Sequence, residues 1–139
     1  MGELTPQRPP PDTRNAGAPY WQAASRGELL LPWCKACAKP VWYPRWHCPV
    51  CGGDELEWKR ASGKGRIYTY TVVRQSADPF FKTRVPFVVA MIELDEGARL
   101  LANVIDCAPE SVSIGMAVSV VFEPLGEQLS IPVFRPTAA

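Results

Sequence analysis

Alternation of hydrophobic and polar residues dominates the second half of the chain and predicts β-structure there. The clearest case is residues 66–75, which we interpret as a strand. Its two faces are expected to carry alternate residues: Ile67, Thr69, Thr71 and Val73 on one, and Tyr68, Tyr70 and Val72 on the other. Four more strands are predicted in short apolar segments bounded by turn residues, at 87–94, 99–105, 118–122 and 129–134. Five short strands with little helix predict a small closed barrel of the OB type.

The first half of the chain has a different pattern. Its proline-rich start predicts an extended arm. A short helix is expected to follow over residues 19–26, because Pro19 suits a first helical turn and Gly27 suits the position just past a helix end. Residues 29–31 and 56–60 then predict two short strands, and residues 108–113 predict at most one helical turn.

These elements predict a mainly β protein with a short N-terminal helix, a zinc ribbon and a C-terminal five-stranded OB-type barrel. We divide the chain accordingly into four parts: an extended arm at 1–18, the short helix and ribbon at 19–60, the barrel at 61–135 and a tail at 136–139.

Four cysteines in two closely spaced pairs carry the strongest chemical signal. Cys34 and Cys37 form one pair, and Cys48 and Cys51 form the other. Each pair can place two thiolates on one tight turn, and two such turns can close a tetrahedral site around one zinc ion. Four cysteine ligands leave no open position for a substrate, so the predicted zinc is structural, and so small a ribbon needs its metal to fold. Because four thiolates can also hold iron, a rubredoxin-like electron carrier is an alternative.

Length and composition limit the classes of protein that fit. The 139 residues, 47% of them hydrophobic, suffice for one domain or for a small module beside a larger one. No apolar run approaches the roughly 20 residues that span a bilayer, and the polar, proline-rich start lacks the pattern of a signal peptide. Paired cysteines at metal spacing then favour a reducing cytoplasm.

The net charge of +1 hides an uneven distribution along the chain. Residues 34–84 contain ten Lys and Arg against four Asp and Glu, whereas residues 85–139 contain two against seven. This polarity suits a ligand with localised negative charge, although ordinary solvated surface explains it as well. The basic residues could hold the phosphates of a small ligand such as coenzyme A, or single-stranded nucleic acid. The nearly neutral total argues against nucleic acid, which we keep as an alternative.

No set of residues predicts catalysis by this chain. The one histidine, His47, is distant in sequence from the fifth cysteine, Cys107, and no glycine-rich phosphate loop precedes a helix. Exposed aromatic residues are what interfaces use as anchors, but aromatic residues also shield metals and fill small cores. We expect Phe80 and Phe81 to lie on a loop, where at least one inserts into a partner or lines a ligand channel. The candidate interface residues are Trp33, Trp42, Trp46, Phe80 and Phe81.

A series of short motifs in order along residues 18–135 resembles a known family. The motifs are Tyr20-Trp21, 27–29, Cys34 and Cys37, 43–45, 48–52, 62–68, 86–90, 93–97 and 115–118. In this series the chain resembles the DUF35 family of OB-fold proteins with a rubredoxin-like zinc ribbon. Where the family usually has glycine after the first metal turn, this chain has Ala38, which costs about 1 kcal/mol if the backbone there is left-handed.

The resemblance implies a helical N-terminal hairpin and a non-catalytic role. Members of the family accompany thiolase-superfamily enzymes that act on acyl-CoA thioesters, in thiolase chemistry or in retro-aldol cleavage of steroid-type β-hydroxyacyl-CoA side chains. An enoyl-CoA hydratase of the hot-dog fold can be a further partner, and no nucleic acid or membrane is implied. Catalytic residues would then lie on the partner. On this interpretation the candidates for contacting CoA phosphates are Arg66, Arg74, Lys82 and Arg84.

Overall fold

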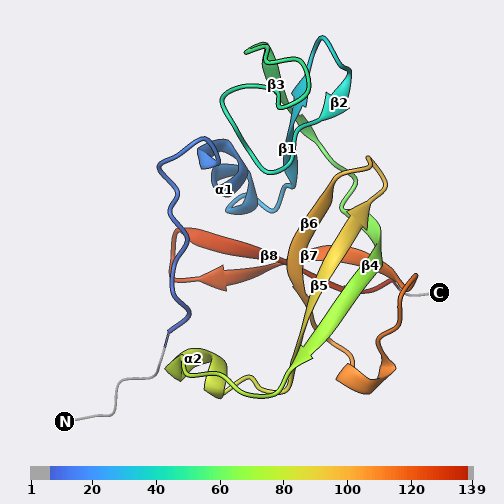
Figure 1. Cartoon of the computed structure of the whole chain (residues 1–139). Coiled ribbons are helices and arrows are strands. Elements are labelled where there is room, and N and C mark those ends of the chain that lie inside the picture. Colours follow the sequence, from blue (N-terminus) through green and yellow to red (C-terminus); the bar gives the residue numbers. More distant parts are fainter. Residues whose placement is uncertain (1–6, 138–139) are drawn as a thin grey trace.

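A three-stranded ribbon stands on a closed five-stranded barrel in residues 7–137, the part of the chain that the computed structural model describes (Figure 1). This arrangement confirms the predicted fold class. Residues 1–6 of the predicted arm and 138–139 of the predicted tail lie outside the described residues. No helix in residues 7–137 is long and apolar enough to cross a membrane.

The barrel closes because the strands at the two ends of its order, β4 and β7, pair with each other. Its strands run in the order β4-β5-β6-β8-β7, and β7 returns to pair with β4. Neighbours are antiparallel except β6 and β8, which meet in parallel where Val104 lies beside Phe134. Their bounds are β4 Lys64–Val73, β5 Phe87–Leu94, β6 Arg99–Val104, β7 Ala117–Leu125 and β8 Leu129–Pro136. Alternate residues of β5 are buried, so the period of two read from the sequence does mark the core face.

The predicted faces of β4 are wrong because the strand contains a β-bulge. Ile67 pairs with Ile92 on β5, but Thr69 already pairs with Met91, so one residue of β4 is left over between them. Beyond this point Tyr70 pairs with Ala90 and therefore lies on the same side as Ile67. An extra residue shifts the alternation by one, which moves every later side chain to the other face.

The ribbon and the barrel share one hydrophobic core. The ribbon has the order β2-β1-β3, and its strands are β1 Leu30–Cys34, β2 Lys39–Pro40 and β3 Leu56–Arg60. β1 is longer than predicted and reaches the first metal turn. Leu29 and Leu31, from the base of the ribbon, belong to the same buried cluster as Ile67 and Phe134 of the barrel. Helix α1, Ala18–Ala24, adds Tyr20 to this cluster.

Short helical turns occupy two of the connections. Helix α2, Pro79–Lys82, replaces the predicted loop because the Asp78 side chain caps its start, accepting from the Phe80 and Phe81 amides at 2.9 and 3.2 Å. The 3-10 helix η1, Pro109–Ser111, is the single turn predicted for residues 108–113. In residues 7–29, α1 is the only helix, in place of the implied helical hairpin.

The N-terminal arm crosses one side of the barrel. From residue 7 it runs without regular structure from beside α2 up to α1 (Figure 1). Arg8 fixes its start by donating to Asn103 Oδ1 on β6 at 3.1 Å. The arm therefore links α2, at the far end of the barrel, to the helix that supports the ribbon.

Candidate metal centre and aromatic surface

Two turns of the ribbon bring four cysteine sulfurs together. Cys34 ends β1, Cys37 lies in the turn after it, and Cys48 and Cys51 lie in the turn before β3. All four Sγ atoms lie within 4.8 Å of one another, with 3.6 Å between those of Cys34 and Cys51 and 3.9 Å between those of Cys37 and Cys48. Zinc–sulfur bonds of about 2.3 Å in a tetrahedron require sulfurs about 3.8 Å apart. The geometry therefore fits a tetrahedral ion with thiolate ligands.

The two turns have the same local geometry. In the first, the Ala38 amide donates to the Cys34 carbonyl at 2.8 Å, and in the second the Gly52 amide donates to the Cys48 carbonyl at 2.8 Å. Both residues are left-handed, with φ of 56° at Ala38 and 75° at Gly52. Ala38 therefore has the left-handed backbone for which we expect, from the sequence, a cost of about 1 kcal/mol.

Backbone amides and neighbouring sulfurs shift the thiol pKa values in opposite directions. Amide N–H groups of Cys51 and Val50 lower the pKa of Cys48 to about 7, because they favour its thiolate. Hydrogen bonds with the sulfurs of Cys51 and Cys34 raise the pKa of Cys37 to about 12. Four thiolates this close repel one another, and a divalent cation would remove that cost.

The predicted interface tryptophans differ in exposure. Trp46 is 72% exposed on the loop between the metal turns, beside Tyr43 at 50%. Trp42 and Trp33 are half-buried and pack against the shared core. The ring of Trp42 lies 5.1 Å from that of Tyr20, and the Lys59 ammonium lies 5.0 Å from the Trp33 ring. Of the three tryptophans, Trp46 is therefore the one whose side chain is most available to a partner.

A groove of about 690 Å³ follows this surface. Its lining includes Trp46, Tyr43 and Trp42 of the ribbon, Trp21 of α1 and Leu101 of β6. Leu101 is 56% exposed, although it is an aliphatic residue in the middle of a strand. A second hollow of about 360 Å³ shares Tyr20, Trp21 and Leu101 with the groove and continues to Phe81 and Phe87. Apolar surface thus extends from the ribbon loop to α2.

Phe80 and Phe81 lie at the α2 end of this surface. Both are half-buried, and their ring centroids are 5.1 Å apart in an edge-to-face arrangement. A guanidinium covers each ring, Arg84 at 4.8 Å from Phe80 and Arg8 at 5.4 Å from Phe81. The two rings therefore already have contacts within the chain.

The four basic residues proposed for CoA phosphates do not form one site. Arg66 lies near the start of β4, where it donates to the Gly115 carbonyl at 3.1 Å. Arg74 follows the other end of β4, and Lys82 and Arg84 belong to the α2 connection. A ten-residue strand is about 33 Å long, so Arg66 lies far from the other three.

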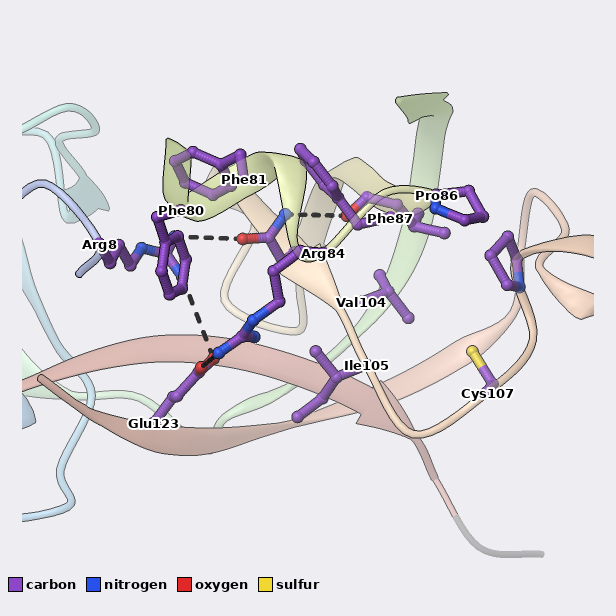
Figure 2. A pocket seen from close by; sticks show the side chains of 13 residues that line it. Arg8, Phe80, Phe81, Arg84, Pro86, Phe87, Val104, Ile105, Cys107 and Glu123 are labelled. Atoms are coloured by element: carbon purple, nitrogen blue, oxygen red, sulfur yellow. Dashed lines mark hydrogen bonds and ion pairs between the residues drawn. The ribbon is translucent and has the colours of Figure 1, made fainter. Parts of the chain in front are cut away.

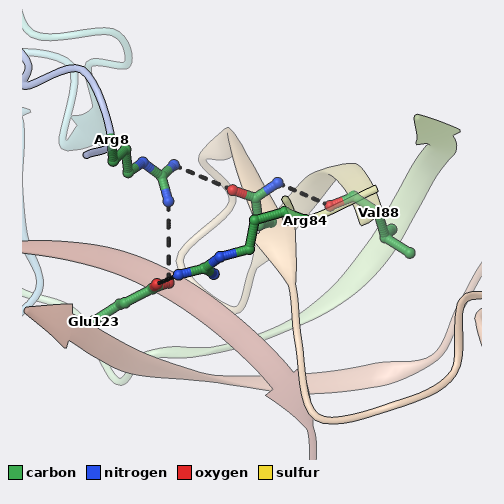
Figure 3. Close-up of polar contacts among 5 residues, drawn as sticks. Arg8, Arg84, Val88 and Glu123 are labelled. Atoms are coloured by element: carbon green, nitrogen blue, oxygen red, sulfur yellow. Dashed lines mark hydrogen bonds and ion pairs between the residues drawn. The ribbon is translucent and has the colours of Figure 1, made fainter. Parts of the chain in front are cut away.

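Sequence reasoning missed a polar cluster beside α2. Arg8, Arg84 and Glu123 meet there: Arg84 Nη2 donates to Glu123 Oε1, and Arg8 Nη1 lies 4.0 Å from Glu123 Oε2 (Figure 3). Asn103 accepts from Arg8 and donates to the Val88 carbonyl at 3.0 Å. Arg8 and Asn103 are 95 positions apart, and no local pattern in the sequence relates them.

Comparison with known proteins gives consistent matches to both parts of the chain. The rubredoxin-like zinc ribbon domain of ChsH2 matches residues 21–57, and the C-terminal OB-fold domain of ChsH2 matches residues 58–123. A solved structure described as an Ltp2-ChsH2(DUF35) aldolase has a TM-score of 0.82 and 35% identity, over 94% of this chain and 100% of that one.

Curated relatives extend these matches. A "DUF35 domain-containing scaffold protein" of Methanocaldococcus jannaschii is 44% identical over 95 residues, which are 68% of this chain and 67% of that protein. A "Probable enoyl-CoA hydratase alpha subunit" of Thermomonospora curvata is 36% identical over 129 residues, 93% of this chain. The chain spans 40% of the length of that second relative.

Proposed function

The chain belongs to the DUF35 family, with the ribbon and OB-fold domains of ChsH2, and on this basis we propose that it is a non-catalytic subunit that docks on a thiolase-fold enzyme. In this proposal it activates the enzyme and helps to form its acyl-CoA channel. The reaction that fits best is retro-aldol cleavage of a steroid-type β-hydroxyacyl-CoA, with thiolase or acyltransferase chemistry as the other possibility. The name of the aldolase to which the fold is similar supports the first.

The continuous apolar surface is the observation that carries the proposal. Trp46, Tyr43 and Leu101 are exposed and line one groove, which continues towards α2. A large aromatic residue at 72% exposure gains nothing from folding, but it can anchor a protein interface. Trp42 packs against the shared core beside this groove, so the exposed rings of Trp46 and Tyr43 are held next to a half-buried one.

Zinc in the ribbon has a structural role in this proposal. Cys34, Cys37, Cys48 and Cys51 would be its four ligands, which leaves no position for substrate. The metal would hold the loop between the two turns, and thus Trp46 and Tyr43, in a fixed position relative to the barrel. For CoA, we propose Arg74, Lys82 and Arg84 near α2 as the phosphate contacts, with Arg66 available to a separate part of the partner.

Co-expression with a thiolase-superfamily protein encoded by a neighbouring gene tests the proposal. We expect a stable complex, more active than the thiolase-fold protein alone. Replacing Trp46 with Ser should weaken the complex at least tenfold, because truncating an anchor residue typically costs about 2 kcal/mol or more and about 1.4 kcal/mol is a factor of ten. Phe80→Ala should weaken it with the metal retained. Ile114→Ala is the matched control, since Ile114 is 69% exposed but does not line the groove.

A partner that is soluble and fully active alone would contradict the proposal. The nucleic-acid alternative makes a separate prediction. Titration of the metal-loaded chain with a labelled single-stranded oligonucleotide at physiological salt should show no micromolar binding. Tight binding that weakens as salt is added would favour that alternative instead.

A further inference from the structure

A pocket of about 190 Å³ opens beneath α2, between the arm and the segment after β6 (Figure 2). Most of its wall is apolar and includes Phe80, Phe87, Val104 and Ile105. Its polar side consists of Arg8, Arg84 and Glu123 with Asn103, and Cys107 lies at the opposite end. The pocket therefore combines a hydrophobic body with charge on one side.

The charge on that side is not balanced. Two guanidiniums, of Arg8 and Arg84, face one carboxylate, that of Glu123, so the three side chains carry a net charge of +1 (Figure 3). Arg84 makes the close contact with Glu123 through a hydrogen bond. Arg8 is left with an ion pair at 4.0 Å and one hydrogen bond, to Asn103 at 3.1 Å. A guanidinium has five N–H donors, so most of those on Arg8 have no acceptor among residues 7–137.

Burial makes this imbalance costly. The Arg8 side chain is 19% exposed, and its desolvation lowers its pKa, with repulsion from Arg84 acting in the same direction and Glu123 opposing both. A partly buried cation is stabilised by a second anion more than an exposed one would be. The arm thus holds a cation over an apolar pocket with room for another acceptor.

We propose that this pocket binds a small monocarboxylate with an apolar body, its carboxylate accepting from Arg8 and Arg84 and its body lying against Val104 and Ile105. Guanidinium forks match the geometry of a carboxylate, which makes it a better ligand than a neutral polar group. An apolar cavity of about 150 Å³ is enough to bind benzene, so a single ring or a short alkyl chain fits the available volume. The docking proposal is not needed for this inference: the two share Arg84, but the pocket is tested on the isolated chain without a partner or CoA.

Titration of the metal-loaded full chain with benzoate or hexanoate, followed by amide NMR shifts, tests the inference. We expect saturable shifts confined to the pocket, including Ile105 and Cys107, with a dissociation constant of about 1 mM or tighter. The same ligands should slow alkylation of the Cys107 thiol, which lines the pocket outside the four-cysteine cluster. Benzyl alcohol has the apolar ring without the negative charge, and inorganic phosphate has negative charge without an apolar group. Both should bind at least tenfold more weakly than benzoate.

Two variants separate charge from shape. Arg84→Gln removes the net positive charge yet keeps Arg8 bonded to Asn103, so the arm stays in place, and it should weaken benzoate binding about tenfold or more. Ile105→Trp should fill the body of the pocket and abolish binding. Arg99→Gln, which removes a cation paired with Glu93 outside the pocket, should leave the affinity unchanged. Absence of pocket shifts, equal binding of benzyl alcohol or of phosphate, or unchanged affinity in Arg84→Gln would overturn the inference.

Discussion

Ala38 and Gly52 occupy equivalent positions in the two metal turns, each four residues after the first cysteine of its pair. Each amide donates to that cysteine's carbonyl at 2.8 Å, and each backbone is left-handed. Only glycine adopts this conformation without steric cost. The two turns therefore have the same backbone geometry. At the left-handed position the first turn has alanine, which is strained there, and the second has glycine, which is not.

Replacing Ala38 with Gly should stabilise the metal-loaded protein by about 1 kcal/mol, because the left-handed turn then carries no Cβ. Gly52→Ala should destabilise it by a similar amount. A Cβ at Gly52 would meet no atom within 4 Å, so this reverse variant isolates backbone strain from crowding. Denaturant unfolding at fixed metal concentration measures both. Equal stability of Ala38→Gly and the parent would contradict the assignment of strain to this residue.

Replacing Cys48 with Ser should abolish stoichiometric metal binding and unfold the ribbon. Cys48 is only 3% exposed, and metal binding supplies a large part of the folding free energy of so small a ribbon. Elemental analysis should give one zinc per parent chain in a colourless protein, whereas one iron would support the electron-carrier alternative. Cys107→Ser is the matched control and should keep the metal, since Cys107 lies outside the four-cysteine cluster.

Acid should release the metal, because protons and the metal compete for the same thiolates. In the folded turn the backbone amides of Cys51 and Val50 lower the pKa of Cys48 to about 7, so wherever this turn forms, the thiolate is present at neutral pH and is lost as the pH falls through 7. Cys37, with its pKa raised to about 12, is protonated throughout this range and must lose its proton to the solvent when the metal binds. Apparent metal affinity should therefore fall steeply from pH 8 to pH 6. Competition with a chromophoric chelator measures it, and a flat profile would argue against thiolate ligands.

Gly65→Ala should destabilise the barrel by about 1–3 kcal/mol. A Cβ at Gly65 would lie 2.5 Å from the Glu93 carbonyl oxygen and 3.1 Å from Leu94 Cα, both of them backbone atoms of the paired strand β5. Backbone atoms of a paired strand cannot move aside as the end of a flexible side chain can. β4 and β5 would therefore have to separate locally around residue 65. Thermal unfolding compares this variant with Thr69→Ala, at an exposed position of the same strand. Similar stability of the two variants would contradict the close approach.

Local patterns were sufficient for the parts of the fold that depend on short segments. The predicted strands 87–94 and 56–60 match β5 and β3, because turn residues bound them clearly. The bulge in β4 could not be read, since a run of Thr and Tyr alternates equally well with one residue inserted. The capped turn of α2 does have a signal, Asp78-Pro79 before two apolar residues, but the same proline and its polar neighbours are equally typical of a loop.

Long-range polar contacts were beyond the same reasoning. The four metal-ligand candidates could be found because their spacing is fixed by the chemistry of one ion. Arg8 had no such constraint: it lies in a proline-rich arm, and its partners Asn103 and Glu123 come from β6 and β7. Which cation of a chain faces which carboxylate depends on how the barrel closes, and that is a property of the whole fold.

Because Leu29, Leu31, Ile67 and Phe134 form one core, metal binding should stabilise the barrel as well as the ribbon. An ion that binds only the folded state raises the free energy of unfolding by an amount that grows with the logarithm of its concentration. Since buried residues of both parts belong to that one core, the increment is shared by strands that have no contact with the ion. The barrel's resistance to unfolding thus becomes a measure of how much free metal surrounds the protein.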